Sequence, residues 1–212
     1  KLYITDDFIV THNTFTTSAA LSKIKKRTII IVKPAYMEKW ASDLHQTLDI
    51  SLSSIMMIRG GKHLISFLTM CDEGGLDENK FAIISNKTYQ IWLKLYEEFG
   101  KEIEALGYPC VPDELFAKYK AGVRLIDEVH QDFHLNFKTD LYTNTDRCIS
   151  LSATLDNYDP VTKKMYLLAY PPESRYNGGE YLMYIDTVAV SYYLEEDRRY
   201  QTSEYAQNNY SH

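Results

Sequence analysis

The sequence contains little cysteine and no long apolar run, and each shortage excludes a class of protein. Its three cysteines are Cys71, Cys110 and Cys148, an odd number without paired spacing. This pattern argues against a disulfide scaffold and a zinc ribbon, and it favours a reducing, cytoplasmic compartment. No apolar stretch approaches the roughly 20 residues of a membrane span, so we expect no membrane partner. Residues 1–7 also lack the charged and then apolar pattern of a secretory leader.

Positive charge is in short supply as well. The 212 residues include 23 Lys and Arg against 29 Asp and Glu, a formal net charge of −6. A chain with this balance is not a general binder of polyanions, so any contact with nucleic acid has to be local. What is present is an ordinary globular composition, with 45% hydrophobic and 25% charged residues. At about 150 residues per domain, the length predicts one domain and a shorter additional segment.

Alternating apolar segments predict an α/β fold. Residues 28–32 (Thr-Ile-Ile-Ile-Val) are apolar without alternation, which is typical of a central parallel strand buried on both faces. We expect further strands over 54–58, 81–85, 123–126 and 148–151, and helices over 14–25, 37–48, 64–70 and 91–103. This order predicts a parallel sheet with helices on both faces. Beyond about residue 158 prolines and tyrosines accumulate, and we interpret 159–212 as a linker.

Two acidic residues follow the expected strand over 123–126. In parallel sheets ligands bind at the carboxyl ends of the strands, where Asp127 and Glu128 fall. Such a pair suits the hydrolysis of a nucleoside triphosphate: Asp127 would hold the Mg²⁺ that bridges the phosphates, and Glu128 would orient or deprotonate the attacking water. His130 would lie between the nucleotide and the rest of the protein. The alternative is a solvated acidic turn after a strand.

The motif Asp127-Glu128-Val129-His130 is followed, after one more strand, by Ser152-Ala153-Thr154. In this order the two segments resemble motifs two and three of superfamily-two helicases, the DEAD/DEAH-box relatives. Residues 30–34 (Ile-Ile-Val-Lys-Pro), followed by Trp40, resemble motif Ia of the same family. The resemblance covers residues 14 to about 155. It implies that 14–158 are a RecA-like first motor domain that lacks its first strand, with a second RecA-like domain beyond the linker.

The resemblance also implies cofactors, partners and roles. The cofactors are ATP and Mg²⁺, and the partner is nucleic acid, DNA being expected rather than RNA. Ser152, Ala153 and Thr154 would couple hydrolysis to domain movement. The contacts to the nucleic-acid backbone would come from residues that follow two of the strands: Lys33, Pro34, Asn86 and Lys87, with Arg124 as a further candidate. For residues 86–88 a plain turn is an equally good interpretation, and Trp40 and Trp92 are expected in the core.

The family's phosphate loop is missing. A Gly-x-Gly-Lys-Thr segment is required before the first helix, because its backbone N–H groups and lysine hold the phosphates. Residues 8–14 read Phe-Ile-Val-Thr-His-Asn-Thr, and of these only Thr14 fits, as the threonine that ligates Mg²⁺. Gly60-Gly61-Lys62 is no substitute and is interpreted as a strand-to-helix turn. The isolated chain is therefore expected to hydrolyse ATP negligibly.

His12-Asn13-Thr14 stands where the loop should close. Residues 2–13, two apolar segments around a polar turn that end in His-Asn, resemble the C-terminal blocks of an intein. In an intein, Asn13 would cyclise and cut the chain, His12 would polarise the carbonyl, and the Thr14 hydroxyl would be the nucleophile that follows. We therefore interpret 1–13 as an intein tail in a helicase of phage or mobile-element type. The alternatives are a β-hairpin leading into a degenerate loop, and an inactive helicase-like module that binds nucleic acid.

Overall fold

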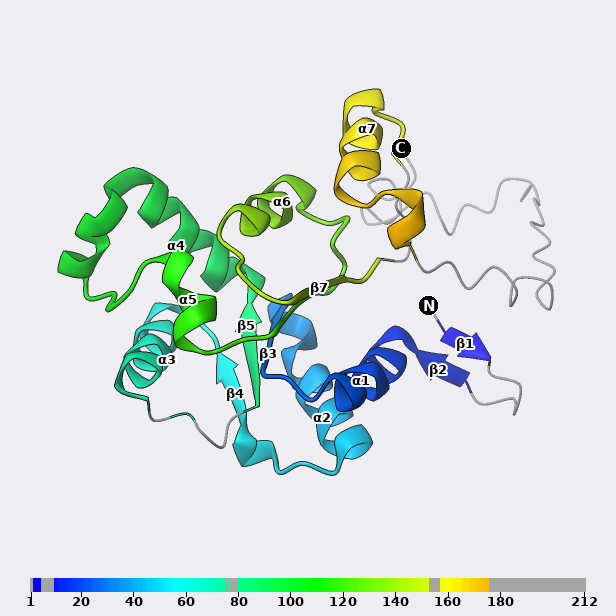
Figure 1. Cartoon of the computed structure of the whole chain (residues 1–212), viewed down its shortest axis with the longest axis horizontal. Coiled ribbons are helices and arrows are strands. Elements are labelled where there is room, and N and C mark those ends of the chain that lie inside the picture. Colours follow the sequence, from blue (N-terminus) through cyan, green and yellow to red (C-terminus); the bar gives the residue numbers. More distant parts are fainter. Residues whose placement is uncertain (1, 5–9, 75, 77–79, 153–156, 176–212) are drawn as a thin grey trace, which may run out of the picture. The chain divides into compact units, whose positions relative to one another are not determined.

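The computed structural model describes residues 2–4, 10–74, 76, 80–152 and 157–175 (Figure 1). The chain divides into two compact units, Lys1–Ala169 and Tyr170–His212. The described part of the second unit, residues 170–175, contains a short turn, η4 (Pro172–Ser174), and Arg175 Nε donates a hydrogen bond to the Tyr170 carbonyl across it (2.6 Å).

A five-stranded, all-parallel sheet forms the centre of the first unit. Its strand order is β4-β5-β3-β6-β7. The strands are β3 (Thr28–Val32), β4 (Ile55–Ile58), β5 (Phe81–Ser85), β6 (Val123–Ile126) and β7 (Arg147–Ser150). The helices are α1 (Asn13–Ile24), α2 (Met37–Leu48), α3 (Gly61–Glu73), α4 (Asn86–Phe99), α5 (Pro112–Lys118), α6 (Phe133–Leu141) and α7 (Pro160–Ala169). Three 3₁₀ turns complete it: η1 (Pro34–Tyr36), η2 (Leu52–Ser54) and η3 (Gly100–Leu106).

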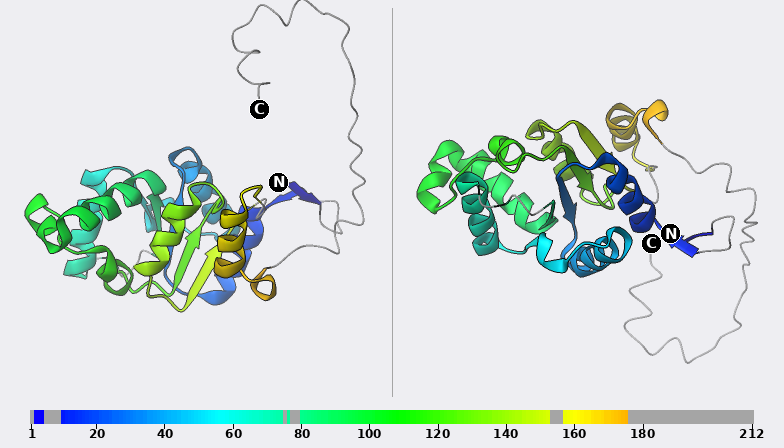
Figure 2. Two further views of the ribbon diagram at one scale, coloured as in Figure 1. Left: turned by 90° about the horizontal axis from the view of Figure 1, so that it is seen from above. Right: turned by 60° about the horizontal axis from the view of Figure 1, so that its bottom comes forward.

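Helices cover both faces of the sheet, as the sequence predicts (Figures 1 and 2). Ile30 and Val32 of β3 pack on one face in a core with Leu21 of α1 and Trp40 and Leu44 of α2. The other face is covered by α3, α4 and α5, which contact one another, and by α6. Every residue of β3 is buried because helices cover both of its sides. The predicted α/β fold, with a sheet compatible with the RecA-like arrangement, is confirmed.

Most expected elements are found, with corrections at two helices. The helix expected over 64–70 is longer, because Gly60 (φ +86°) starts the helix and Gly74 (φ +77°) ends it in conformations that favour glycine. The helix expected over 91–103 begins at Asn86 and ends at Phe99. Its buried side is set by Tyr89, Trp92 and Leu93, while Ile91 is 59% exposed. The interpretation of 86–88 as a loop or plain turn is therefore wrong, because they form the first helical turn.

A separate two-stranded antiparallel sheet precedes α1. It pairs β1 (Leu2–Ile4) with β2 (Val10–His12), in the register Leu2 with His12. The two expected strands before Asn13 are thus present, and the polar turn expected at Asp6-Asp7 lies outside the described residues. Three helices were not expected, namely α5, α6 and α7, and with α7 the first unit extends to Ala169, past the boundary expected near residue 158. Among the described residues, no helix has both the length and the apolar character needed to cross a membrane.

Candidate active site at the ends of β6 and β7

The two acids lie where β6 leaves the sheet. Asp127 N–H donates to the Ile31 carbonyl (3.1 Å), which extends the pairing with β3 by one residue. Leu151 N–H donates to the Ile126 carbonyl and Val129 N–H to the Leu151 carbonyl, both at 2.9 Å. The ends of β6 and β7 are thereby held together. Because side chains alternate along a strand, Asp127 shares the face of Leu125, which is the face covered by α1 and α2.

The carboxylate of Asp127 is fixed at both oxygens. Trp40 Nε1 donates to Oδ2 (2.8 Å), and the backbone N–H of Glu128 donates to Oδ1 (3.0 Å). Thr14 is not among these donors. It lies buried in the first turn of α1, where its carbonyl accepts a hydrogen bond from Ser18 Oγ (2.8 Å). The structure therefore joins Asp127 to Trp40 and Glu128, and it does not join Asp127 to Thr14 by a hydrogen bond.

Glu128 has an unusual backbone and an unsatisfied side chain. Its φ of +52° lies in the left-handed region, and Gln131 N–H donates to its carbonyl (2.9 Å), which closes a turn. A non-glycine residue in this region is strained, and such strain is often found at functional sites. The side-chain oxygen Oε2 is buried without a hydrogen-bond donor. A buried carboxylate oxygen can accept a hydrogen bond, and in folded proteins such oxygens usually do.

His130 links the two motifs. Its Nδ1 lies 2.9 Å from Ser152 Oγ with hydrogen-bond geometry, and 3.3 Å from Glu128 Oε2, an ion pair only when the imidazole is protonated. The shorter contact is the hydrogen bond. The structure thus brings together Glu128, His130 and Ser152, three of the predicted site residues. Ala153 and Thr154 lie outside the described residues.

Two residues that were not predicted as site residues hold the loop formed by residues 127–131 in place. The amide of buried Asn136 donates to the carbonyls of Val129 (3.0 Å) and Gln131 (2.7 Å). Tyr166 of α7 donates its hydroxyl to the His130 carbonyl (3.4 Å), and its ring packs edge-on against Phe133 with centroids 4.5 Å apart. Neither residue belongs to a recognisable motif. A polar residue at a buried helical position was the available signal for Asn136.

The predicted nucleic-acid contacts gather at the same edge of the sheet. Lys33 and Pro34 follow β3, Asn86 and Lys87 follow β5, and these two strands are neighbours. Lys87 is exposed, and Lys33, Pro34 and Asn86 are half-buried. Exposed Arg59, which follows β4, donates through Nη2 to the Pro34 carbonyl (3.3 Å). Arg59 was not predicted as a contact, although it directly follows a strand in the same way as Lys33.

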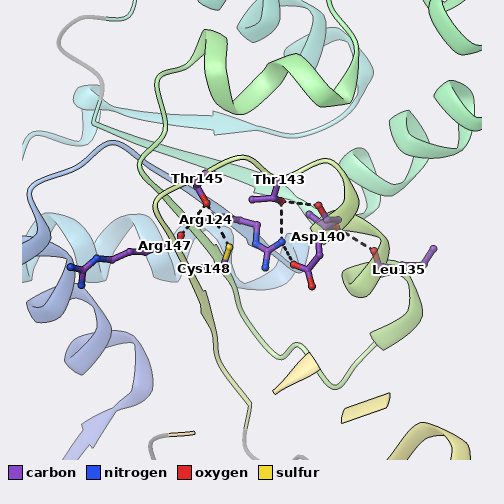
Figure 3. A network of polar contacts seen from close by, with 8 residues as sticks. Arg124, Leu135, Asp140, Thr143, Thr145, Arg147 and Cys148 are labelled. Carbon is purple, nitrogen blue, oxygen red and sulfur yellow. Dashed lines mark hydrogen bonds and ion pairs between the residues drawn. The ribbon is translucent and has the colours of Figure 1, made fainter. Parts of the chain in front are cut away.

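Arg124 is not a nucleic-acid contact, contrary to expectation. It is 2% exposed, and its guanidinium group is directed toward Asp140 of α6 (Figure 3). Its Nη1 is paired with Asp140 and donates to Thr143 Oγ1 (3.0 Å), and Thr143 in turn donates to the Thr139 carbonyl (2.7 Å). A buried cation of this kind needs a charged partner, and the network fastens α6 to β6.

The residues present fit a magnesium site in which the protein supplies few of the ligands. Among the described residues, no group of three or more His, Cys, Asp or Glu side chains is placed to hold a metal, so this part of the chain builds no complete cage. Mg²⁺ is commonly held by one or two carboxylates together with waters and substrate phosphates. A single fixed carboxylate, Asp127, has the donor chemistry for that role.

The chain was compared with protein-family models, with curated proteins and with solved structures, and none of the three comparisons found a match.

Proposed function

We propose that the chain is part of a nucleic-acid-dependent ATP hydrolase of the superfamily-two helicase type. The observation that carries the proposal is the contact between His130 and Ser152 (2.9 Å), beside the fixed carboxylate of Asp127 and the half-buried Glu128, whose Oε2 is buried. Both members of the motif pair meet at the carboxyl edge, where parallel sheets bind their ligands. A solvated acidic turn would not need hydrogen bonds to both oxygens of Asp127 and a contact between His130 and Ser152.

The proposed chemistry divides the work among these side chains. Mg²⁺, when bound with ATP, would neutralise charge on the β- and γ-phosphates. Asp127 is its ligand from the protein. Glu128 Oε2, buried and without a donor, accepts a hydrogen bond from the attacking water and takes its proton. His130 contacts both Glu128 and Ser152, so a change in the charge of Glu128 would alter the contact of His130 with the segment that begins at Ser152.

The missing phosphate loop has a proposed place in this sheet. β3 connects through α2 to β4, and α1 packs on the same face as α2. Because parallel crossovers are right-handed almost without exception, a parallel strand before α1 would lie on the side of β3 away from β4. β6 and β7 already occupy that side, so the free position is beside β7, where Arg147 and Cys148 are exposed. In the proposal an upstream strand and its Gly-Lys loop take this place.

Protein splicing would connect that upstream strand and its loop covalently to α1. His12 ends β2 and Asn13 begins α1, so the Asn13–Thr14 bond lies in the first turn of α1, one residue after the junction with the β1–β2 sheet. Cyclisation of Asn13 would release residues 1–13, and Thr14 would become joined to the loop lysine. The proposal therefore assigns His12, Asn13 and Thr14 to splicing and Thr14 also to the completed phosphate site.

A second candidate function is a nucleic-acid-binding module that does not hydrolyse ATP. The observation that favours it is that Lys33, Arg59 and Lys87 follow three adjacent strands, whereas residues 8–14 contain no lysine. Binding would then need only the carboxyl edge of β4, β5 and β3.

Intact-mass measurement after expression with the upstream sequence tests the proposal. A ligated product whose downstream half starts at Thr14, and which is lost with Asn13→Ala, is expected. In that product ATP hydrolysis should require Mg²⁺ and fall by about 10² or more with Glu128→Gln, since removal of a positioned base typically costs 10²–10⁴-fold. Glu98→Gln, at an exposed position of α4, is the matched control and should leave the rate unchanged.

Other results would contradict the proposal. An unchanged mass with 1–13 attached, together with oligonucleotide binding, would establish the binding module instead. Robust Mg²⁺-dependent hydrolysis by the isolated chain, lost with Glu128→Gln, would require a phosphate site that does not depend on the missing loop.

A further inference from the structure

We propose that Trp40 is a positioning residue for Asp127, which it holds in the orientation that binds a divalent cation. The inference rests on the proposed metal-binding role of Asp127. Trp40 lies on α2, far from Asp127 in the sequence, and its Nε1 donates to Asp127 Oδ2 at 2.8 Å. Trp40 would therefore not touch the metal itself and would act only through its hydrogen bond to Asp127.

The two hydrogen bonds that hold the Asp127 carboxylate leave it able to bind a cation. Each carboxylate oxygen has two lone pairs, and in Asp127 each oxygen receives one hydrogen bond, from Trp40 or from the Glu128 backbone. One lone pair per oxygen is left for a cation or its water shell. Groups that hydrogen-bond a metal ligand from behind typically change metal affinity by about 10–100-fold when they are removed.

The indole of Trp40 is itself immobile. It is 1% exposed and packs in the core with Leu21, Val32 and Leu44, so its N–H direction is set by helices and strands rather than by a loop. A rigid donor restricts the side-chain rotation of Asp127 more than a donor on a flexible side chain could. The pair joins α2, which begins directly after the η1 turn at Pro34, to the end of β6.

The simpler interpretation is that Asp127 only satisfies a buried indole N–H. The second tryptophan argues against a strict need for such a partner. Trp92 is 0% exposed, and its Nε1 has no hydrogen-bond partner in the structure. The fold therefore accommodates one buried indole without an acceptor. The pairing at Trp40 is specific to the site where a fixed carboxylate is useful.

Trp92 also supplies a matched control. Trp40→Phe and Trp92→Phe each remove an indole from the interior, but only the first removes a hydrogen bond to Asp127. The probe is Mn²⁺, used in place of Mg²⁺, added to the full chain. Its affinity is measured from the electron paramagnetic resonance signal of free Mn²⁺, and its place from the broadening of the two indole ¹⁵N–¹H resonances.

We expect Mn²⁺ to broaden the Trp40 resonance before that of Trp92, and Asp127→Asn to abolish this binding. Trp40→Phe should weaken Mn²⁺ binding about tenfold, and Trp92→Phe should leave it unchanged. Without metal, Asp127→Asn should shift the Trp40 indole resonance and leave that of Trp92 in place. This shift reports the hydrogen bond in a protein whose core is intact.

Two failures are distinguishable. If Trp40→Phe and Trp92→Phe bind Mn²⁺ equally well, Trp40 is a core residue only and the inference is overturned, while the role of Asp127 stands. If Asp127→Asn does not alter Mn²⁺ binding, the metal role of Asp127 is overturned, and the proposed function with it. Should Trp40→Phe not fold, β-(3-benzothienyl)alanine incorporated into Trp92→Phe keeps the ring shape at position 40 without the N–H, and unchanged affinity there overturns the inference.

Discussion

The backbone of Glu128 is strained at a residue to which we assign a catalytic role. A left-handed conformation costs an L-residue roughly 1–2 kcal/mol, and the buried Oε2 without a donor adds to this. Glu128→Gly removes both costs, and we expect the free energy of unfolding to rise by about 1 kcal/mol after the entropic cost of glycine, roughly 0.5–1 kcal/mol, is subtracted. Activity of the ligated protein would be lost, a familiar exchange of function for stability.

Urea unfolding measures the effect, and Lys120→Gly is the control. Lys120 has a similar φ of +55° but an exposed side chain, so its replacement relieves only the backbone. We expect a gain smaller than that of Glu128→Gly. A loss of stability with Glu128→Gly would show that the turn needs the glutamate for folding rather than for chemistry.

Asn136 determines the shape of the same loop through two carbonyls. Asn136→Ala leaves the carbonyls of Val129 and Gln131 without their donor, and we expect a loss of about 2 kcal/mol, within the range for unsatisfied buried groups. Exposed Asn144→Ala should change stability by less than roughly 0.5 kcal/mol. Equal effects in urea unfolding would mean that the loop keeps its form without Asn136.

At the scale of elements, the strands were predictable and some helices were not. β3 is a run of apolar residues with two covered faces, so its composition alone identifies it. In α6 the buried positions are Phe133, Asn136 and Thr139, two of them polar, and the helix starts from Asp132 with φ +57°. The buried positions of α6 therefore lack the apolar spacing of 3 to 4 residues by which a helix is recognised. The acids of the site were predictable from their place after a strand. Trp40, which binds Asp127, and Asn136 and Tyr166, which bind the carbonyls of the turn that follows, come from other elements.

The attachment of α7 depends on its first turn. Thr162 donates to Asp159 through its hydroxyl (2.6 Å) and its backbone N–H (2.8 Å), and these bonds hold the pKa of the Asp159 carboxyl below its ordinary value of 3.8. Because the folded-state pKa is lowered, the contribution is present above pH 3.8 and is lost as the pH falls through the lower folded-state value. We therefore expect hydrogen-exchange protection of α7 to fall in that acid range.

Asp159→Ala should remove the same protection at neutral pH and, with it, the contact from Tyr166 to the His130 carbonyl. Lys164→Ala, an exposed change in the middle of α7, is the control and should leave protection unchanged. Protection that does not differ between Asp159→Ala and the unmodified chain would mean that the packing of Tyr166 on Phe133 is sufficient to hold the helix.

At the scale of the whole molecule, a net charge of −6 repels nucleic acid everywhere except where basic side chains gather. The carboxyl ends of β4, β5 and β3 carry Arg59 and Lys62, Lys87, and Lys33. Four such contacts to a single strand predict that log K falls with log salt at a slope of about −3, from about −0.7 per phosphate contact. A bulk polycation would give a much steeper slope.

Lys87→Ala should therefore weaken the binding of a single-stranded oligonucleotide and reduce the slope in magnitude by about 0.7, since one phosphate contact is lost. Lys101→Ala is the matched control, because Lys101 is also exposed but lies in η3, beyond the opposite end of α4. Fluorescence anisotropy across a salt series measures both slopes. If the two variants change the slope equally, binding follows the overall charge of the molecule. If only Lys87→Ala changes it, nucleic acid contacts the edge of the sheet that also carries Asp127 and Glu128.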